Sequence, residues 1–450
     1  MSKYPYIPNT DNDVREMLDV IGVESLEDLF SDIPSDLRVK GELDLPKAKS
    51  EGEVFSYLGR LAKKNKTVND LTCFLGGGAY DHYIPTAVHH ITGRSEFYTA
   101  YTPYQPEISQ GTLQYIFEFQ TLMTRLTGME YANASLYDSQ TAVAEAAIMT
   151  VSMSKKNKIA ISETVDPQAI KVLKTYAHAR GYEVVIIPCK DMVTDLDKAK
   201  ELVDDTVGTV IIQSPNFYGY FEDMPSFVEL AHEKKKRYIV QSTSAHALTN
   251  MKKPGEMDVD VVVGEGQGLG IPLSFGGPYL GLLAFKKDFI RKIPGRIVGE
   301  TTDLDGKRSY VLTLSAREQH IKRERATSNI CSNQGLNVLA ATVYMSILGK
   351  KGMKEVSAQC IAKSHYLFDE LKKLDKVKVL ADKPFFQEFT IGFDASDEEV
   401  LKKLEENGIL GGIRLSKINK ELGNGLIIAV TEKRTKEEMD KFVEVMKEVL

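Results

Sequence analysis

Short apolar runs alternate with amphipathic segments through the middle of the chain. The apolar runs have the length of strands and lie at residues 158–161, 184–188, 207–213, 238–242, 259–263 and 282–285. Segments with helical spacing of apolar positions lie before and between them, at 113–126, 142–153, 167–180, 196–202 and 225–234. Apolar strands that alternate with helices are typical of a parallel sheet covered on both faces. This part of the chain is therefore predicted to be α/β, with a mostly parallel sheet.

The two ends of the chain have different patterns. Residues 1–65 predict short helices, at 11–18 and 25–29, and the prolines at 34 and 46 prevent either helix from extending further. Helices this short are unstable alone, so we expect an N-terminal arm that packs on a partner. The chain from 326 to 450 predicts few strands and no repeated crossover, which indicates a small C-terminal α+β domain. The expected domains are thus 1–65, a large α/β domain at 66–325, and 326–450.

Composition excludes several classes of protein. The chain is 42% hydrophobic and carries a net charge of −6, which gives no general attraction to nucleic acid or to an anionic membrane. No apolar run is long enough for a membrane span, and the first residues lack the apolar core of a secretion signal. The four cysteines are far apart and form no CxxC, as in a protein with reduced thiols. We expect a cytoplasmic protein.

Residues 76–83, with the sequence GGGAYDHY, form the first candidate motif. Three successive glycines let the backbone approach a ligand closely, or form a tight turn before a helix. Both interpretations remain open. His82 and His89 could share a helix face, but no nearby carboxylate supports a metal site, so no metal is expected.

An aromatic segment, FYTAYTPYQPEI at residues 97–108, is the most unusual part of the sequence. Its prolines stiffen the backbone, and its tyrosines provide stacking faces and hydroxyl groups. Such a segment is costly to expose to water and too polar for a core. It indicates an interface or a ligand pocket, with the candidate residues Tyr98, Tyr101, Tyr104, Gln105 and Glu107.

Two polar turns each precede a helix. Residues 133–142 open a helix of small residues and indicate either an anion site at the helix start or an ordinary helix cap. Residues 326–333 contain Thr327, Ser328 and Asn329, which could cap the next helix or offer donors to a phosphate across an interface. The glycine-rich segment 264–270 does not fit the GxGxxG pattern, and Pro272 would break an immediate helix, so a dinucleotide site is not favoured.

Four segments together resemble a known family. They are residues 76–80, 98–110, 133–141 with Glu145, and 317–332, which reads REQHIKRERATSNICS. The chain resembles glycine dehydrogenase (decarboxylating), the P-protein of the glycine cleavage system, and in particular the α subunits of members that are split into two chains. The similarity runs from the arm to the C-terminus.

The resemblance implies a fold-type I pyridoxal-phosphate architecture that has lost its cofactor anchor. Catalytic chains of this type have a lysine that forms an imine with the cofactor, an aspartate at the ring nitrogen and a histidine stacked on the ring. The corresponding positions here hold Gln267, Thr243 and Asp166. Glutamine cannot form the imine. Pyridoxal phosphate is therefore expected on a partner β subunit and not covalently on this chain.

The resemblance also implies the activity and the partners. With its β subunit, in an α2β2 tetramer, the chain would decarboxylate glycine and pass the aminomethyl group to the lipoyl arm of the H-protein. It would complete the partner's site across the interface. The aromatic segment would line that site, and the partner's phosphate would be faced by Thr327, Ser328 and Asn329.

Two alternatives belong to other classes of function. One is a structural or regulatory pseudoenzyme subunit with no residue in the working site. The other is an independent pyridoxal-phosphate lyase or aminotransferase that uses Lys252 or Lys253 in place of the missing lysine.

Overall fold

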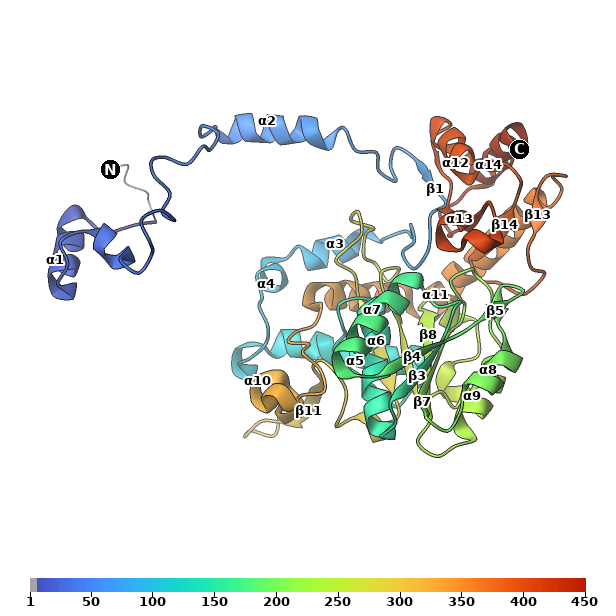
Figure 1. The fold of residues 1–450 in the computed structure, drawn as a ribbon, viewed down its shortest axis with the longest axis horizontal. Helices are drawn as coiled ribbons and strands as arrows, with labels where there is room; N and C mark the ends of the chain where they lie inside the picture. The colour runs from blue at the N-terminus through green and yellow to red at the C-terminus, as the bar shows by residue number, and fades with distance from the viewer. Residues whose placement is uncertain (1–5) are drawn as a thin grey trace. The chain divides into compact units, whose positions relative to one another are not determined.

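The computed structural model describes residues 6–450, which belong to two compact units, Met1–Asn65 and Lys66–Leu450. The first unit contains α1 (Asp11–Ile21), η1 (Leu26–Phe30) and α2 (Glu51–Ala62) (Figure 1). Thr10 and Asp13 form a capping box at the start of α1, which satisfies backbone N–H groups that the helix itself leaves free. No described residue of this unit is buried, so its helices have no core of their own.

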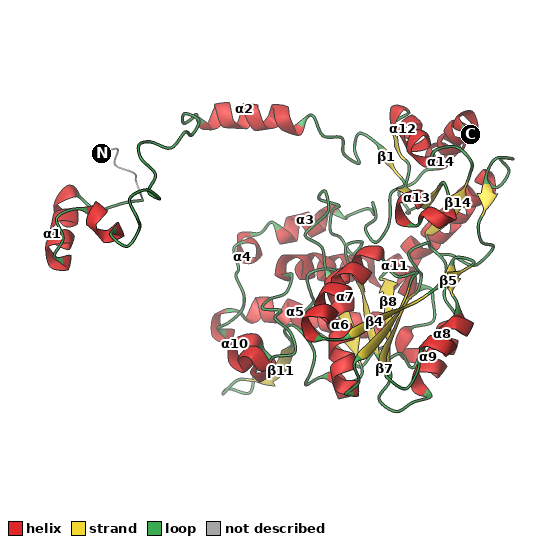
Figure 2. Ribbon diagram, viewed as in Figure 1, coloured by secondary structure: helices red, strands yellow, loops and turns green. Residues whose placement is uncertain are grey.

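A seven-stranded sheet forms the centre of the second unit (Figure 2). Its strands are, in spatial order, β2 (Tyr131–Ala132), β10 (Gly281–Phe285), β9 (Val261–Glu265), β8 (Tyr238–Ser244), β7 (Val207–Gln213), β3 (Lys158–Ser162) and β4 (Glu183–Ile187). The pairs from β9 through β4 are parallel, and β10 pairs antiparallel with both β9 and β2. The carboxyl ends of five neighbouring parallel strands therefore lie along one edge.

Helices cover both faces of this sheet because its strands are apolar on both sides. In β9, Val261 and Val263 contribute to one core cluster and Val262 to the opposite one. The first cluster is covered by α6 (Ser139–Ser154) and α7 (Pro167–Arg180). The opposite cluster is covered by α5 (Gln110–Thr127), α8 (Leu196–Leu202), α9 (Met224–His232) and the first part of α11 (Gly335–Leu371).

A smaller antiparallel sheet holds the C-terminal part of the chain. Its strands are, in spatial order, β13 (Lys378–Val379), β14 (Glu388–Gly392), β17 (Gly425–Ala429) and β16 (Ile413–Arg414). They share a core with the later part of α11, with α12 (Asp397–Glu406) and with α14 (Lys436–Val449). Beside this sheet, β1 (Thr72–Cys73) pairs in parallel with β15 (Ile409–Leu410), which brings the start of the second unit against its C-terminal part.

The remaining elements are short connections. They are α3 (Thr86–Thr92), α4 (Ser95–Tyr98), η2 (Pro106–Ile108), β5 (Cys189–Lys190), β6 (Val193–Thr194), η3 (Ala247–Thr249), η4 (Pro254–Met257), η5 (Lys287–Phe289), β11 (Val298–Thr302), β12 (Arg308–Leu312), η6 (Ser315–Arg317), α10 (Gln319–Lys322), η7 (Arg323–Arg325), α13 (Leu415–Ile418) and η8 (Lys420–Leu422). Within residues 6–450, no helix combines the length and the apolar character that crossing a bilayer requires.

The predicted mostly parallel sheet with helices on both faces is confirmed, as is the α+β character of the C-terminal part. The hairpin of β11 and β12 was not predicted, because its sequence is polar and has no alternating apolar pattern. The helical conformation of α11 is interrupted at Gly349 (φ 57°, ψ −173°). The division of the second unit at residue 326 stays a prediction.

Candidate functional site

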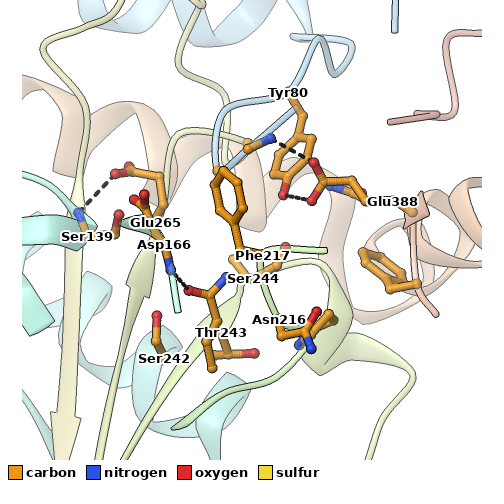
Figure 3. A pocket seen from close by; sticks show the side chains of 18 of the residues that line it. Tyr80, Ser139, Asp166, Asn216, Phe217, Ser242, Thr243, Ser244, Glu265 and Glu388 are labelled. Carbon is orange, nitrogen blue, oxygen red and sulfur yellow. Dashed lines mark hydrogen bonds between the residues drawn. The ribbon is translucent and has the colours of Figure 1, made fainter. Parts of the chain in front are cut away.

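A small cavity lies at the carboxyl ends of the parallel strands, where open α/β sheets usually bind their ligands (Figure 3). Its volume is about 50 Å³, which is room for a few water molecules. Polar side chains from four strand ends line it, together with the segment Gly77–Tyr80 and residues of β14. The polar lining residues include Tyr80, Ser139, Asp166, Gln213, Asn216, Ser242, Thr243, Ser244, Glu265, Gln387 and Glu388.

Gln267 is buried, and its side chain holds the glycine segment in place. Its Oε1 accepts a hydrogen bond from the backbone N–H of Tyr80 at 2.8 Å. Its Nε2 donates to the backbone oxygens of Tyr80, at 3.2 Å, and of Ile271, at 2.7 Å. Each polar atom of the amide is thus bonded to backbone, and the residue does not line the cavity. The glutamine acts here as a structural tie between two segments.

Glu388 closes the glycine segment from the other side. Its Oε1 accepts from the backbone N–H of Gly77 at 2.7 Å, and its Oε2 accepts from the hydroxyl of Tyr80 at 2.5 Å. A Cβ atom on Gly76 would lie 2.0 Å from the Glu388 carboxylate, so only glycine fits there. Burial raises the pKa of Glu388 to about 7, against the opposing effect of these two hydrogen bonds.

A second carboxylate occupies the N-terminus of α6. The Oε2 of Glu265 accepts from the backbone N–H of Ser139 at 3.0 Å, while its Oε1 accepts from the backbone N–H groups of Gln267 and Leu280. Asp138 caps the same helix by accepting from the N–H of Thr141 at 2.7 Å. Burial raises the pKa of Glu265 to about 8, in spite of its three backbone donors. The donors at this helix start are therefore used within the chain.

Asp166 has a capping role at the start of α7. It accepts hydrogen bonds from the side-chain amide of Gln140 at 2.6 Å and from the N–H of Gln168 at 2.8 Å, and its own N–H donates to Gln213. Burial raises its pKa. Thr243 also lines the cavity, from the end of β8. The resemblance placed Asp166 and Thr243 at one ligand site, and both do line the same cavity.

The aromatic segment lies elsewhere on the second unit. The predicted residues Tyr98, Tyr101, Tyr104, Gln105 and Glu107 are all exposed, and none lines the cavity at the strand ends. Tyr101 is 83% exposed. The hydroxyl of Tyr104 accepts from Nη2 of Arg296 at 3.3 Å, and the guanidinium lies 5.1 Å from the centre of the tyrosine ring. An exposed aromatic group is thus anchored on a buried cation.

The predicted Thr-Ser-Asn turn is followed by a serine that contacts the same arginine. Arg296 also donates from Nη1 to the hydroxyl of Ser332 at 3.2 Å, just beyond Thr327, Ser328 and Asn329. The backbone oxygen of Thr327 accepts from Arg180 at 2.7 Å, and Asn329 is exposed. Arg296 therefore connects the aromatic segment with the strand-free segment that comes after the turn. The proposed roles of these residues in catalysis or phosphate binding stay predictions.

The sequence analysis missed the residues that organise both regions. Glu265 lies within the glycine-rich segment, two residues before Gln267. This position could have identified it from the sequence as a candidate site residue. Glu388 approaches from a strand 311 residues beyond Gly77, and no local pattern reveals such a contact. Arg296 comes directly after a proline and a glycine in an unremarkable stretch of sequence. Its importance comes only from the side chains that pack around it.

Comparisons with known proteins agree with this architecture. A crystal structure of glycine decarboxylase (P-protein) of the glycine cleavage system, in inhibitor-bound form, matches with a TM-score of 0.90 and 39% identity, over 99% of this chain and 100% of that one. A C-DES mutant with glycine covalently linked to its PLP cofactor matches in fold, with a TM-score of 0.63 and 14% identity, over 85% of this chain and 98% of that one. The fold is that of fold-type I pyridoxal-phosphate enzymes, as predicted.

The family is established by sequence comparison. The glycine cleavage system P-protein family matches residues 4–446. A probable glycine dehydrogenase (decarboxylating) subunit 1 from Geobacillus sp. (strain WCH70) is 52% identical over 438 residues, which is 97% of each chain. The chain belongs to the glycine cleavage system P-protein family, which confirms the resemblance.

The residues at the strand edge do not fit the cofactor of this fold. A cavity of about 50 Å³ is far below the size of roughly 300–1,000 Å³ that is usual for ligand pockets. A phosphate at the start of α6 would compete with Glu265 for Ser139 and lie beside Asp138. Among the described residues, no lysine lines the cavity. Lys253 instead donates to the backbone oxygen of Arg125 at 2.7 Å, so it gives the independent-enzyme alternative no support.

We predict that Glu388→Gln flattens the dependence of stability on pH. Because the pKa of Glu388 is raised in the folded chain, its contribution to stability is greatest below its ordinary pKa near 4.5 and is lost as pH rises to about 7. The amide has the same shape and no charge to bury. Between pH 4.5 and 8, the free energy of unfolding of the variant should therefore fall by up to about 3 kcal/mol less than that of the wild type. Urea unfolding at four pH values measures the difference.

The exposed Glu229→Gln serves as the matched control and should leave the pH profile unchanged. If stability depended on pH in the same way for Glu388→Gln and the wild type, Glu388 would not be the buried carboxyl group that keeps its proton.

Proposed function

We propose that the chain is the non-lysine-bearing subunit of a two-chain glycine dehydrogenase (decarboxylating). With a β subunit that carries pyridoxal phosphate, it decarboxylates glycine and transfers the aminomethyl group to the lipoyl arm of the H-protein. The cofactor supplies the electron sink for the carbon that loses carbon dioxide. The family membership and the relatives named subunit 1 support this proposal.

One observation supports the proposal that the β subunit, and not this chain, carries the cofactor. The place where this fold binds its cofactor is filled here by the chain's own groups, with Gln267, Glu265 and Glu388 all bonded to neighbouring backbone. A chain of an enzyme family with a filled site needs a second chain for the chemistry. The alternative of a purely structural or regulatory subunit shares this observation, and the aromatic segment distinguishes the two.

The residues that this chain contributes lie on its exposed side. The aromatic segment, with Tyr98, Tyr101, Tyr104, Gln105 and Glu107, lines the partner's site from across the interface. Its tyrosines exclude water from one side of bound glycine, and Glu107 places a carboxylate there. Arg296 fixes the position of Tyr104. The turn with Thr327, Ser328 and Asn329 faces the partner's phosphate, and the buried Arg296 adds positive charge nearby.

The arm supports an obligate assembly. It exposes large apolar side chains, among them Ile21, Phe30 and Phe55, and none of its described residues is buried. Apolar patches of this kind mark surfaces that are covered in a complex. We propose an α2β2 tetramer in the cytoplasm, with interfaces of more than about 2,000 Å².

Mixing the purified chain with its β subunit tests the function directly. We expect one stable species with the mass of two copies of each chain, and release of carbon dioxide from glycine by that species alone when H-protein is present. Analytical ultracentrifugation and a carbon dioxide assay measure the two outcomes. A failure of the chains to associate at micromolar concentration would leave the proposed function without support.

The isolated chain should not bind pyridoxal phosphate covalently. After borohydride reduction with one equivalent of cofactor, its mass should be unchanged, while the β subunit should gain one pyridoxyl group. Gln267→Lys alone should not restore binding, because Glu265 still occupies the start of α6 and Asp166 and Thr243 are unchanged. A stoichiometric adduct on one lysine of the wild-type chain would refute this assignment. Intact-mass spectrometry and peptide mapping provide the measurement.

The aromatic segment should matter for turnover and not for folding. In the assembled complex, Tyr101→Phe or Glu107→Gln should lower the glycine–bicarbonate exchange rate more than tenfold, which corresponds to about 1.4 kcal/mol or more. The melting temperature of the chain should change little, since both side chains are exposed. Tyr83→Phe, which changes an exposed tyrosine outside the segment, is the matched control. Full activity of both variants would favour a structural or regulatory subunit.

A further inference from the structure

A buried cluster of metal-binding side chains lies beside the closed cavity. It contains His82 after the glycine segment, Cys360 in α11 and Glu432 after β17, and their ligand atoms lie within 4.8 Å of one another. Nδ1 of His82 is 2.6 Å from Oε2 of Glu432, and Sγ of Cys360 is 3.6 Å from the same oxygen. The sequence alone gave no sign that Glu432 lies near His82. Folding brings Glu432 to His82 from 350 residues away.

Polar atoms around this cluster lack partners. Nε2 of His82, Nδ1 of His246 and the hydroxyl of Tyr344 are buried and have no hydrogen-bond partner among the described residues. The ring centres of His82 and His246 lie 4.3 Å apart with the rings tilted by 43°, and those of His246 and Tyr344 lie 6.0 Å apart. Buried polar atoms are normally bonded to protein, to water or to an ion. An unpartnered nitrogen on a residue of the cluster itself, His82, indicates that the site holds something besides protein.

We infer that His82, Cys360 and Glu432 form a binding site for a divalent transition-metal ion, with Zn²⁺ as the ion that the donor set fits best. Imidazole nitrogen, thiolate sulfur and carboxylate oxygen are the three donor types that zinc uses in proteins. A thiolate and a carboxylate together carry two negative charges, which the ion neutralises. The fourth position of a tetrahedral ion is left for a water molecule.

The separations agree with such an ion only after the cluster adjusts, because its ligand atoms span up to 4.8 Å and the widest pair would close by up to about 1.2 Å. Zinc bonds of about 2.3 Å to sulfur and about 2.1 Å to oxygen place tetrahedral ligands roughly 3.6 Å apart, which is the observed separation of Cys360 and Glu432. The nitrogen and oxygen ligands would lie roughly 3.4 Å apart. The separation of 2.6 Å between His82 and Glu432 is that of a direct hydrogen bond, so the ion would replace the proton and widen this pair by under 1 Å.

The site would join three distant parts of the second unit. It connects the segment after Tyr80, which closes the cavity, to the long helix α11 and to the C-terminal part of the chain. Binding energy of a metal that requires such a preformed arrangement is also folding energy. The inference does not depend on the proposed function, because it rests only on ligand atoms that this chain itself brings together.

Elemental analysis tests the inference. The full-length chain, purified with its β subunit without a histidine tag and without chelator, should retain about one zinc per copy of this chain. Cys360→Ser and Glu432→Gln should each reduce this amount more than tenfold. When Co²⁺ replaces zinc, the wild-type chain should show a near-ultraviolet thiolate-to-cobalt charge-transfer band, and Cys360→Ser should lose it. Cys189→Ser and His90→Gln, which change the same residue types elsewhere, should retain both metal and band.

The wild-type chain decides the outcome even if a variant fails to fold. Removal of the metal should lower its melting temperature, and added Zn²⁺ should restore it. Absence of both retained zinc and the cobalt band in the wild type would overturn the inference. A cobalt band that persists in Cys360→Ser would overturn the assignment of the sulfur ligand.

Discussion

The hydrogen bonds of one buried side-chain amide hold the glycine segment in its place at the cavity. The side chain of Gln267 bonds to both backbone groups of Tyr80, across 187 residues of sequence, and to the oxygen of Ile271. A buried amide whose partners are removed costs about 1–3 kcal/mol, so the glycine segment is favoured in this position. A lysine here would have no acceptor role toward the N–H of Tyr80. The closed segment therefore depends on the same substitution that removes the imine-forming amine.

The electrostatics of the strand edge result from this closed arrangement. Glu265 accepts from Gln267 as well as from Ser139, so the segment that carries the amide also positions a carboxylate at the start of α6. A helix N-terminus favours an anion, and here the chain's own carboxyl groups, on Asp138 and Glu265, take up its backbone donors. A loss of cofactor binding by removal of the lysine alone would leave an intact phosphate site. In this chain Glu265 also takes up a donor at the start of α6, so a substitution at residue 267 alone would leave that contact in place.

The fold was largely predictable from the sequence, and the organisation of the site was not. The strands β3, β7 and β10 and the helices α7 and α8 are predicted by local periodicity, which depends on residues a few positions apart. The cavity, in contrast, is closed by Glu388, and the metal cluster is completed by Glu432, each more than 300 residues from its partner. The positions of Gln267, Thr243 and Asp166 came from a family resemblance, since no local pattern assigns them. The hairpin of β11 and β12 escaped prediction because polar residues dominate it.

The small volume of the cavity also bears on the stability of the fold. An open pocket lowers stability, by about 24 cal/mol for each cubic ångström of apolar void in one series of core substitutions. Chains that bind a ligand recover this loss on binding. Here only about 50 Å³ remains, and its walls are bonded to one another through Glu265, Glu388 and Gln267. Tyr101, Tyr104 and Asn329 are exposed and take no part in these contacts. The residues that stabilise the cavity and those on this exposed surface can therefore change independently.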